Sequence, residues 1–307
     1  MQKFITLIVY ISLATSMFAQ EDVELRTVYQ TFKDTRVINA HSVETLKAGM
    51  LDFRVGHRFG DIAGDNGGWE TFFGLENASD ILIGFEYGLS DNFMIGISRT
   101  NGGLSSLVDS TLAGGERRVE LPKANVNGLF KYRLATQNNK GTPFSISLLG
   151  LMTVSTQKKT LSESNLNFFA KPAHRLSYHG EFMVAKKFNS YFSLQFSGAW
   201  TYRNIKPPGD TNDVVSAGIT SRIQMSKSMA LILDGRYVFS DIRTADGGYY
   251  PPIGIGLEWE TGGGHVFQIN LTNATGLMET DYIPYTRSNW LDGEFRLGFT
   301  IGRQFRI

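Results

Sequence analysis

The amino-acid sequence predicts an all-β protein, a transmembrane antiparallel up-and-down β-barrel of about 12 strands. Three observations lead to this prediction. Apolar and polar residues alternate along many segments, tight turns alternate with longer loops, and an export signal precedes a chain with no other long apolar run. An exported protein that lacks a helical span of about 20 apolar residues is either soluble or a β-barrel.

The composition excludes several classes of protein. The 307 residues include 30 Lys and Arg, 29 Asp and Glu, and no Cys, which gives a formal net charge of +1. This balance provides no basic surface for nucleic acid, so no nucleic-acid partner is expected. The lack of Cys excludes disulfides, a thiolate nucleophile and Cys-ligated metal centres. The 33 glycines, 8 prolines and 12% aromatic residues fit many short strands.

The chain begins with a predicted cleaved signal peptide at residues 1–19. Lys3 precedes the apolar run from Phe4 to Ala14, and small residues lead to Ala19. This order is typical of secretory signals. A retained membrane anchor is the alternative, but polar residues interrupt a run that is already short for a span.

Two regions follow the signal. Residues 20–46 show no clear strand pattern, and we expect either a periplasmic segment or a plug. Residues 47–307 form the predicted barrel and show repeated period-2 alternation. In residues 191–204 the even positions carry Phe, Leu, Gly, Trp and Tyr, whereas the odd positions carry mainly Ser, Gln, Thr and Arg. Such a strand has one face suited to lipid and one suited to water.

Twelve segments with this alternation cover about half of the mature chain, more than the usual strand share of a globular domain. They are residues 47–59, 81–89, 92–100, 119–134, 143–155, 175–188, 191–204, 214–225, 229–239, 252–261, 265–275 and 291–307.

The connections between the segments alternate between short and long. The tight turns are Ser90-Asp91, Asn189-Ser190, Ser226-Lys227-Ser228 and Gly262-Gly263-Gly264, and 135–142 is a somewhat longer turn. The longer stretches are 60–80, 101–118, 156–174, 205–213, 240–251 and 276–290. An even strand count with short turns at one end is the layout of an outer-membrane barrel whose turns are periplasmic.

A secreted β-sandwich or a lipocalin-like barrel is the alternative, because both also alternate. Those folds place the apolar face inside, and small barrels hold only a limited core. Twelve strands would enclose a lumen too wide for side chains alone to fill. We therefore favour the membrane barrel.

The C-terminal residues resemble the β-signal that ends the final strand of outer-membrane proteins. The pattern consists of Thr300, Gly302, Phe305 and Ile307, although many bacterial members end in an aromatic residue. The resemblance implies the barrel-assembly machinery as a partner and outer-membrane lipid as the surroundings.

Four longer motifs resemble an uncharacterised, domain-of-unknown-function family of outer-membrane β-barrels in Bacteroidota. The motifs are SVETLK at 42–47, GHRFGD at 56–61, GGWETFFGL at 67–75 and ETGGGHVFQ at 260–268. The resemblance extends from about residue 30 to the end of the chain. It implies an outer-membrane location and supplies no catalytic or substrate assignment.

Charged side chains collect on the polar faces of the strands, which would line the lumen. The candidate lumen residues are Asp52, Arg54, Arg58, Glu86, Lys131, Arg133, His179, Glu181, Arg203, Arg222, Asp234, Arg236, Glu258, Glu294 and Arg296. Rings of fixed charge can line a selective pore, whereas opposite charges on adjacent strands can pair and brace the interior. Because the signs balance, we favour bracing with a narrow or plugged lumen, and the wide pore stays open as the alternative.

Loop 60–80 is the most distinctive of the predicted external loops. It carries the candidate mouth residues Trp69, Phe72 and Phe73 among glycines. Two interpretations are open. The loop folds back to constrict the mouth, which we favour, or it presents an aromatic patch to a partner.

No catalytic site, metal site or cofactor is predicted, and the protein is not expected to be an enzyme. His179 with Glu181 and Ser177 is the best lumen-side catalytic candidate, but alternation alone places polar residues there. His174 and His179 are five residues apart and face opposite sides, which does not suit metal binding by one strand.

The predicted function is a passive channel or transport-related barrel for small solutes. A structural or assembly barrel that anchors partner proteins is the main alternative, and a barrel-embedded hydrolase is the least favoured one. The sequence leaves the solute, the partner and the oligomeric state open.

Overall fold

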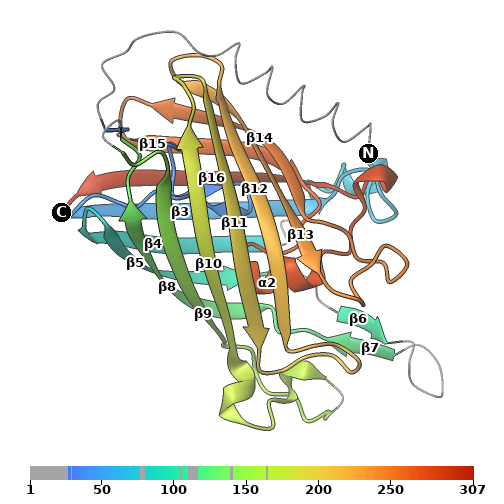
Figure 1. Cartoon of the computed structure of the whole chain (residues 1–307). Helices are drawn as coiled ribbons and strands as arrows, with labels where there is room; N and C mark the ends of the chain where they lie inside the picture. The colour runs from blue at the N-terminus through green and yellow to red at the C-terminus, as the bar shows by residue number, and fades with distance from the viewer. Residues whose placement is uncertain are drawn as a thin grey trace, which may run out of the picture.

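In the computed structural model, twelve antiparallel strands form one closed barrel (Figure 1). The structure describes residues 27–28, 30–76, 80–103, 106–109, 117–138, 141–163 and 165–307. The predicted fold class is confirmed. The predicted signal peptide, residues 1–19, lies outside the described residues. Among the helices of the described ranges, none is long and apolar enough to cross a membrane.

Each barrel strand pairs with its neighbour in the chain, and β16 closes the barrel on β3. The barrel strands are β3 (Met50–Asp61), β4 (Asp80–Ser90), β5 (Phe93–Asn101), β8 (Ala124–Ala135), β9 (Ser145–Ser155), β10 (Leu176–Lys187), β11 (Phe192–Arg203), β12 (Asp213–Gln224), β13 (Met229–Phe239), β14 (Ile253–Thr261), β15 (His265–Thr272) and β16 (Arg296–Arg306).

The alternation along the strands separates an apolar outside from a polar inside. On β11, Phe196 and Trp200 point outward with 57% and 46% of their surface exposed, whereas Ser193 and Gln195 are buried inside. Large apolar side chains are exposed in the same way around the barrel. A soluble sandwich would bury these side chains, so the outward apolar band fits lipid.

Three predicted segments are longer by three residues or more than the strands that form. Residues 119–134 divide, because Pro122 lacks a backbone N–H and restricts the residue before it. β8 therefore begins at Ala124, and β7 (Arg117–Glu120) instead pairs with β6 (Ser106–Asp109) in a separate hairpin between β5 and β8.

The other two overestimates fall on either side of the last long loop. β15 ends at Thr272 rather than at residue 275. β16 begins at Arg296 rather than at residue 291, because the 3-10 helix η4 (Trp290–Asp292) ends at Gly293 with a left-handed φ of 77°. Glycine adopts this conformation without strain, so it reverses the chain before the strand starts.

The turns and the loops lie at opposite ends of the barrel. We call these the short-turn end, where both β3 begins and β16 ends, and the long-loop end. In barrels of this kind the short turns face the periplasm. The long-loop end carries three further 3-10 helices, namely η1 (Trp69–Thr71), η2 (Leu166–Phe168) and η3 (Pro172–Arg175).

Residues 30–46, here called the lumen segment, run inside the barrel. The segment enters at the short-turn end, where the Lys187 amine donates to the Gln30 carbonyl at 3.1 Å. It forms a hairpin of β1 (Arg36–Val37) and β2 (Ala40–His41) and then returns to β3. Nearly every residue from 31 to 46 is buried.

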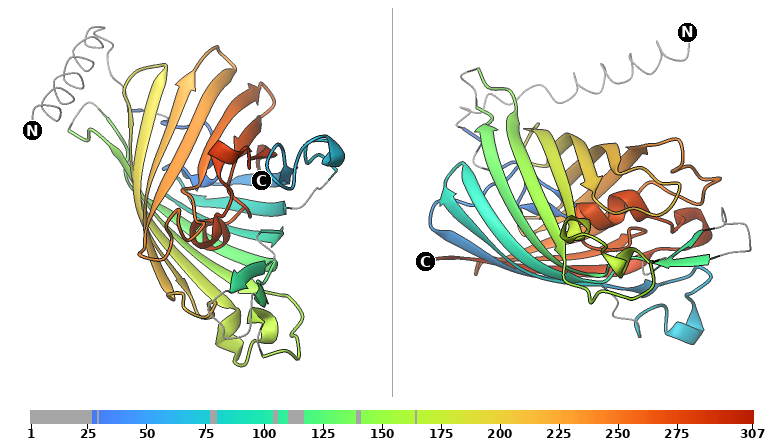
Figure 2. Two further views of the ribbon diagram at one scale, coloured as in Figure 1. Left: turned by 90° about the vertical axis from the view of Figure 1, so that its right-hand side faces the viewer. Right: turned by 90° about the horizontal axis from the view of Figure 1, so that it is seen from below.

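Loop 273–295, here called the inner loop, enters the barrel from the long-loop end. It carries α2 (Glu279–Tyr285), which lies within the ring of strands when the barrel is seen from that end (Figure 2, left). Leu277 and Met278 pack against Leu82 and Leu151 of the wall. The two segments together fill much of the interior.

Candidate functional site

The inner wall and the two segments that it encloses form the candidate site. Most predicted lumen residues lie on this wall and are buried, with Arg222 and Arg296 half-buried. The buried set is Asp52, Arg54, Arg58, Glu86, Lys131, Arg133, His179, Glu181, Arg203, Asp234, Arg236 and Glu258. Glu294 is a correction, because it precedes β16 and accepts a hydrogen bond from the Asn289 backbone at 2.6 Å within the loop.

Near the short-turn end, Glu44 of the lumen segment pairs with Arg133 of β8. The carboxylate lies 2.6 Å from the Arg133 guanidinium. Its other oxygen accepts hydrogen bonds from the backbone N–H groups of Thr31 and Phe32 at 2.8 and 3.2 Å. Glu44 thus joins the two arms of the lumen segment to the wall.

Deeper in the barrel, Asp34 of the lumen segment is bound by Arg54 of β3. One guanidinium nitrogen donates to the Asp34 carboxylate at 2.8 Å, and a second bonds both Asp34 and Asp52. Asp34 and Asp52 therefore share one cation. All three groups are buried, so breaking the ion pair without admitting water would be costly.

Lys131 of β8 binds the backbone of the lumen segment at three points. Its amine donates to the carbonyls of Thr35, Ser42 and Glu44 at 3.0, 2.9 and 3.0 Å. An ammonium group has three donors and no acceptor. All three are therefore satisfied by the lumen segment.

Two wall glutamines bind the lumen segment as a neighbouring strand would. Gln195 accepts from the Val43 N–H at 2.7 Å and donates to the His41 carbonyl at 2.8 Å. Gln268 accepts from the Ile38 N–H at 3.2 Å and donates to the Arg36 carbonyl at 2.9 Å. These amides satisfy backbone groups in and next to β1 and β2.

The tip of the lumen segment contacts the wall nearer the long-loop end. Asn39 donates to Asp234 through its backbone at 3.1 Å and through its side chain at 3.0 Å. Arg58 bonds the Asn39 side chain and also the carbonyls of Ala274 and Gly276 in the inner loop. Arg58 thus holds both segments.

The two segments also meet directly at Glu279. The Glu279 carboxylate lies 3.6 Å from Arg36 and 3.8 Å from His41, and all three residues are buried. Burial and the nearby Arg36 cation hold the pKa of His41 well below its ordinary value of 6.5. His41 is therefore neutral at pH 7 and can accept a hydrogen bond from Arg36, whose nitrogen is 2.8 Å away.

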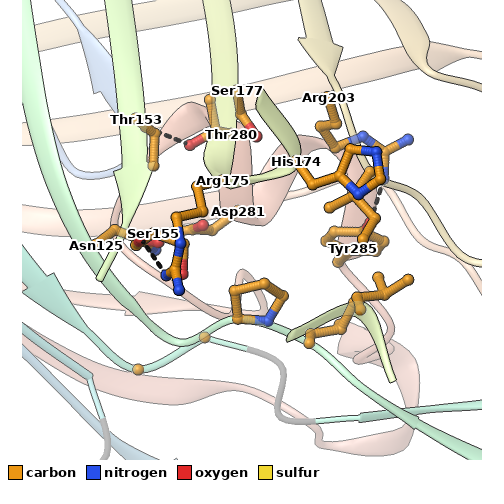
Figure 3. A pocket seen from close by; sticks show the side chains of 16 residues that line it. Asn125, Thr153, Ser155, His174, Arg175, Ser177, Arg203, Thr280, Asp281 and Tyr285 are labelled. Carbon is orange, nitrogen blue, oxygen red and sulfur yellow. Dashed lines mark hydrogen bonds between the residues drawn. The ribbon is translucent and has the colours of Figure 1, made fainter. Parts of the chain in front are cut away.

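The inner loop has its own set of polar contacts. Arg203 and Arg243 both bind Asp210, at 3.2 and 2.7 Å, and Arg203 also bonds the Tyr285 hydroxyl. Thr280 lies 2.9 Å from Thr153 on the wall. Thr153, Arg203, Thr280 and Tyr285 line a small pocket of about 50 Å³, which Figure 3 shows.

Two larger cavities lie at the ends of the barrel. One of about 470 Å³ lies at the short-turn end and is lined by both arms of the lumen segment. One of about 280 Å³ lies at the long-loop end and is lined in part by Ile283 and Thr286 of the inner loop. The lumen segment and α2 lie between these ends.

His179 does not pair with Ser177, the hydroxyl considered from the sequence. Its two ring nitrogens contact Thr201 at 2.8 Å and Glu181 at 3.4 Å, rather than Ser177. Glu181 in turn bonds Arg236. Across the described part of the chain, no group of three His, Cys, Asp or Glu residues has the arrangement of a metal site.

Loop 60–80 does not constrict the mouth, so the interpretation that we favoured from sequence is wrong. Trp69, Phe72 and Phe73 are 78%, 52% and 44% exposed. The loop projects sideways from the wall at the long-loop end in both views of Figure 2. The inner loop, rather than this one, enters the mouth.

The model of a membrane-bound beta barrel domain family (DUF5777) matches residues 32–305. The chain belongs to this family. The DUF5777 barrel is thus membrane-bound, and the outer membrane is where barrels of this construction occur. The match begins within the lumen segment and includes the inner loop.

Solved structures share the barrel architecture at low similarity. The NanC porin matches with 10% identity and a TM-score of 0.46, over 84% of this chain and 99% of that one. The COG4313 outer membrane channel from Pseudomonas putida F1 matches with 13% identity and a TM-score of 0.46, over 86% and 98%. Outer membrane phospholipase A from Escherichia coli matches with 9% identity and a TM-score of 0.42, over 94% and 95%. Likeness of this degree says nothing of what the DUF5777 barrel transports. No curated protein matches the sequence.

Several residues of the site were not among the sequence candidates. They are Asp34, Arg36, His41 and Glu44 of the lumen segment, Asp210 and Arg243 of the loops, and Glu279 of α2. Their one sequence signal is charge within segments that have no strand pattern. Charge alone does not indicate which wall residue each of these side chains binds.

Proposed function

We propose that the protein is an outer-membrane channel for small solutes whose lumen is closed by the lumen segment. The observation that carries the proposal is that residues 30–46 are attached to the wall mainly by polar groups. Asp34, Glu44 and several backbone groups of the segment bond wall side chains. A wall built to bind a polar segment can bind water and solute once the segment leaves.

The energetics support a removable plug rather than a permanent core. A hydrogen bond exchanged for one to water changes the free energy by only about 0.5–1.5 kcal/mol. Buried ion pairs bring little net stability compared with apolar packing of the same volume. A segment that only braced the barrel would be stabilised better by apolar contacts with the wall.

Channel conductance tests this proposal. The mature protein and a variant without residues 30–46 are compared in planar lipid bilayers. We expect the intact protein to be mostly closed and the deletion variant to conduct continuously. Heat-modifiable gel migration of both proteins checks that each barrel is folded. Equal conductance of two folded barrels would overturn the plug assignment, and no conductance from either would overturn the channel.

The proposal includes the route of the protein to the membrane. Residues 1–19 serve as the cleaved signal, and residues 300–307 serve as the β-signal for the barrel-assembly machinery. The chain comes from Bacteroidota and acts as a channel rather than as an enzyme. Substitution of Phe305 by Asp should reduce the folded barrel in the outer-membrane fraction, and unchanged assembly would contradict the β-signal.

Partner anchoring is a second candidate function, and the exposed aromatic loop favours it. The ring of Trp69 meets the rings of Phe72 and Phe73 edge-on, with ring centroids 6.4 and 6.2 Å apart. Both phenylalanines have left-handed φ angles of 48° and 55°, which non-glycine residues rarely adopt. Crosslinking followed by purification from an outer-membrane fraction tests this role. Recovery of the barrel alone would count against it.

A further inference from the structure

The cavity at the short-turn end has the size of a small-ligand site. Its volume of about 470 Å³ falls within the range of about 300–1,000 Å³ that such sites occupy. It lies between the lumen segment and the ends of β3, β8 and β16. Its charged lining consists of Lys33, Glu44, Lys47, Asp91, Arg133 and Arg306.

The two carboxylates of this lining are already bound. Glu44 pairs with Arg133 and accepts two backbone hydrogen bonds. Asp91 accepts from the Ala48 N–H at 3.1 Å and lies 3.7 Å from Lys47. The lining thus holds four basic and two acidic groups, and Lys33 is also paired with Glu260 outside the lining, which leaves an excess of one positive charge.

Arg133 has one donor group, Nε–H, that no described residue binds. The residue is 5% exposed, and its Nη2 group bonds Glu44. Its Nε–H group is buried and has no hydrogen-bond partner in the described ranges of the chain. A guanidinium group can bind a carboxylate or phosphate through two parallel hydrogen bonds. Arg133 therefore lines the cavity with a guanidinium group whose hydrogen-bonding capacity is not fully used.

Arg306 adds a second basic group at the rim of the cavity. It is exposed at the end of β16 and forms no ion pair with any residue that the structure describes. Lys33 of the lumen segment lies 2.5 Å from Glu260 but remains partly exposed. Together with Arg133, these groups place positive charge on both the wall and the segment.

We propose that this cavity binds a small organic anion through a carboxylate or phosphate group. The inference deepens the proposed function by naming the class of solute. Passage of the anion through the barrel depends on the proposed channel function. Binding itself requires only the closed conformation.

Calorimetry of the mature protein in detergent micelles tests the site with four probes of similar size. Gluconate carries a carboxylate, glucose 6-phosphate carries a phosphate, glucose is neutral and glucosamine is cationic. We expect at least one of the two anions to bind about tenfold more tightly than glucose, because charge-assisted hydrogen bonds are the stronger ones. Binding of one anion alone identifies the preferred group. Anions that bind no better than glucose would overturn the proposal.

Substitutions locate the binding. Arg306→Gln should weaken anion binding about tenfold, whereas Arg303→Gln on the lipid-facing side of the same strand should leave it unchanged. Arg133→Lys keeps a cation beside Glu44 but removes the planar guanidinium group and its paired donors. This substitution should also weaken anion binding. Equal affinity of the Arg303 and Arg306 variants would place the ligand elsewhere. Conductance without anion binding would overturn this site alone, and binding without conductance would overturn only the channel.

Discussion

The lumen segment and the inner loop both fill the barrel, but they are held by different forces. The inner loop packs apolar side chains on the wall, among them Leu277, Met278 and Ile283. The lumen segment contributes Phe32, Val37, Ile38 and Val43 to one apolar cluster, in which the wall supplies only the smaller share, Ala185 and Ile232. Its bonds to the wall are largely polar.

This difference indicates which segment can leave the barrel. Removing the inner loop exposes apolar surface on both the loop and the wall, at about 25 cal/mol for each Å². The lumen segment can keep much of its apolar cluster together as it moves. Its polar partners on the wall can exchange to water. We therefore expect the lumen segment to be the movable closure and the inner loop to be the fixed one.

The largest effect should come from neutralising the carboxylates of the lumen segment. Asp34→Asn with Glu44→Gln removes both ion pairs while leaving the wall intact. Breaking a buried ion pair costs about 3–5 kcal/mol because it strands the remaining charge. Water entering behind the segment relieves that charge, so open-channel events should rise at least tenfold in bilayer recordings.

Glu70→Gln is the matched control for that experiment, because Glu70 is an exposed carboxylate of loop 60–80. It should conduct as the natural protein does. A double variant that stays as closed as this control would contradict the polar attachment of the lumen segment.

A smaller effect should distinguish the inner loop by its dependence on pH. Burial, with added repulsion from Asp80 and Glu279, raises the pKa of Asp281 to about 8. Because this pKa is raised, the protonated carboxyl stabilises the folded loop fully when the pH is below its ordinary pKa of 3.8. The stabilisation falls as the pH rises above 3.8 and is lost once the pH passes about 8. Hydrogen exchange of residues 276–285 should therefore become faster between pH 4 and pH 8.

Asp281→Asn should flatten that dependence, because the amide does not ionise. Exchange in the variant is compared with that of the natural protein after correction for the intrinsic effect of pH. The same slope in both proteins would show that Asp281 does not govern the attachment of the inner loop.

The smallest effect should come from Trp69, which lies outside the mouth. Trp69→Ala removes an exposed side chain whose nearest rings belong to its own loop. Conductance should remain within error of the natural protein. A clear change would mean that loop 60–80 reaches the pore after all.

The sequence predicts the barrel well because strand alternation is a local property. Each strand shows its two faces within about ten residues. The alternation alone places the starts of β8 and β16 too early, and Pro122 and Gly293 explain where these strands begin. The burial of wall charges such as Arg54 and Arg133 follows from the same alternation.

The sequence does not predict what those charges bind. Glu44 and Arg133 are 89 residues apart, and Val43 and Gln195 are 152 apart. Pairs at such separations leave no periodic pattern. The outward position of Trp69 could not be predicted from the sequence either. Left-handed φ angles occur at Phe72 and Phe73, where no glycine indicates them.

Two engineered disulfides test which segment opens the barrel, and they form without competition because the natural chain has no Cys. The hydroxyls of Thr31 and Ser145 lie 3.4 Å apart and join the lumen segment to the wall. Those of Thr153 and Thr280 lie 2.9 Å apart and join the inner loop to the wall. Each pair is replaced by two cysteines in the protein that carries both carboxylate substitutions of the lumen segment. Conductance is then recorded before and after reduction.

We expect the disulfide formed by Thr31→Cys and Ser145→Cys to close the channel and its reduction to reopen it. The disulfide formed by Thr153→Cys and Thr280→Cys should leave the conductance unchanged. The opposite result would be a barrel that conducts with the disulfide at 31 and 145 but closes with the disulfide at 153 and 280. It would mean that the inner loop, rather than the lumen segment, opens and closes the channel.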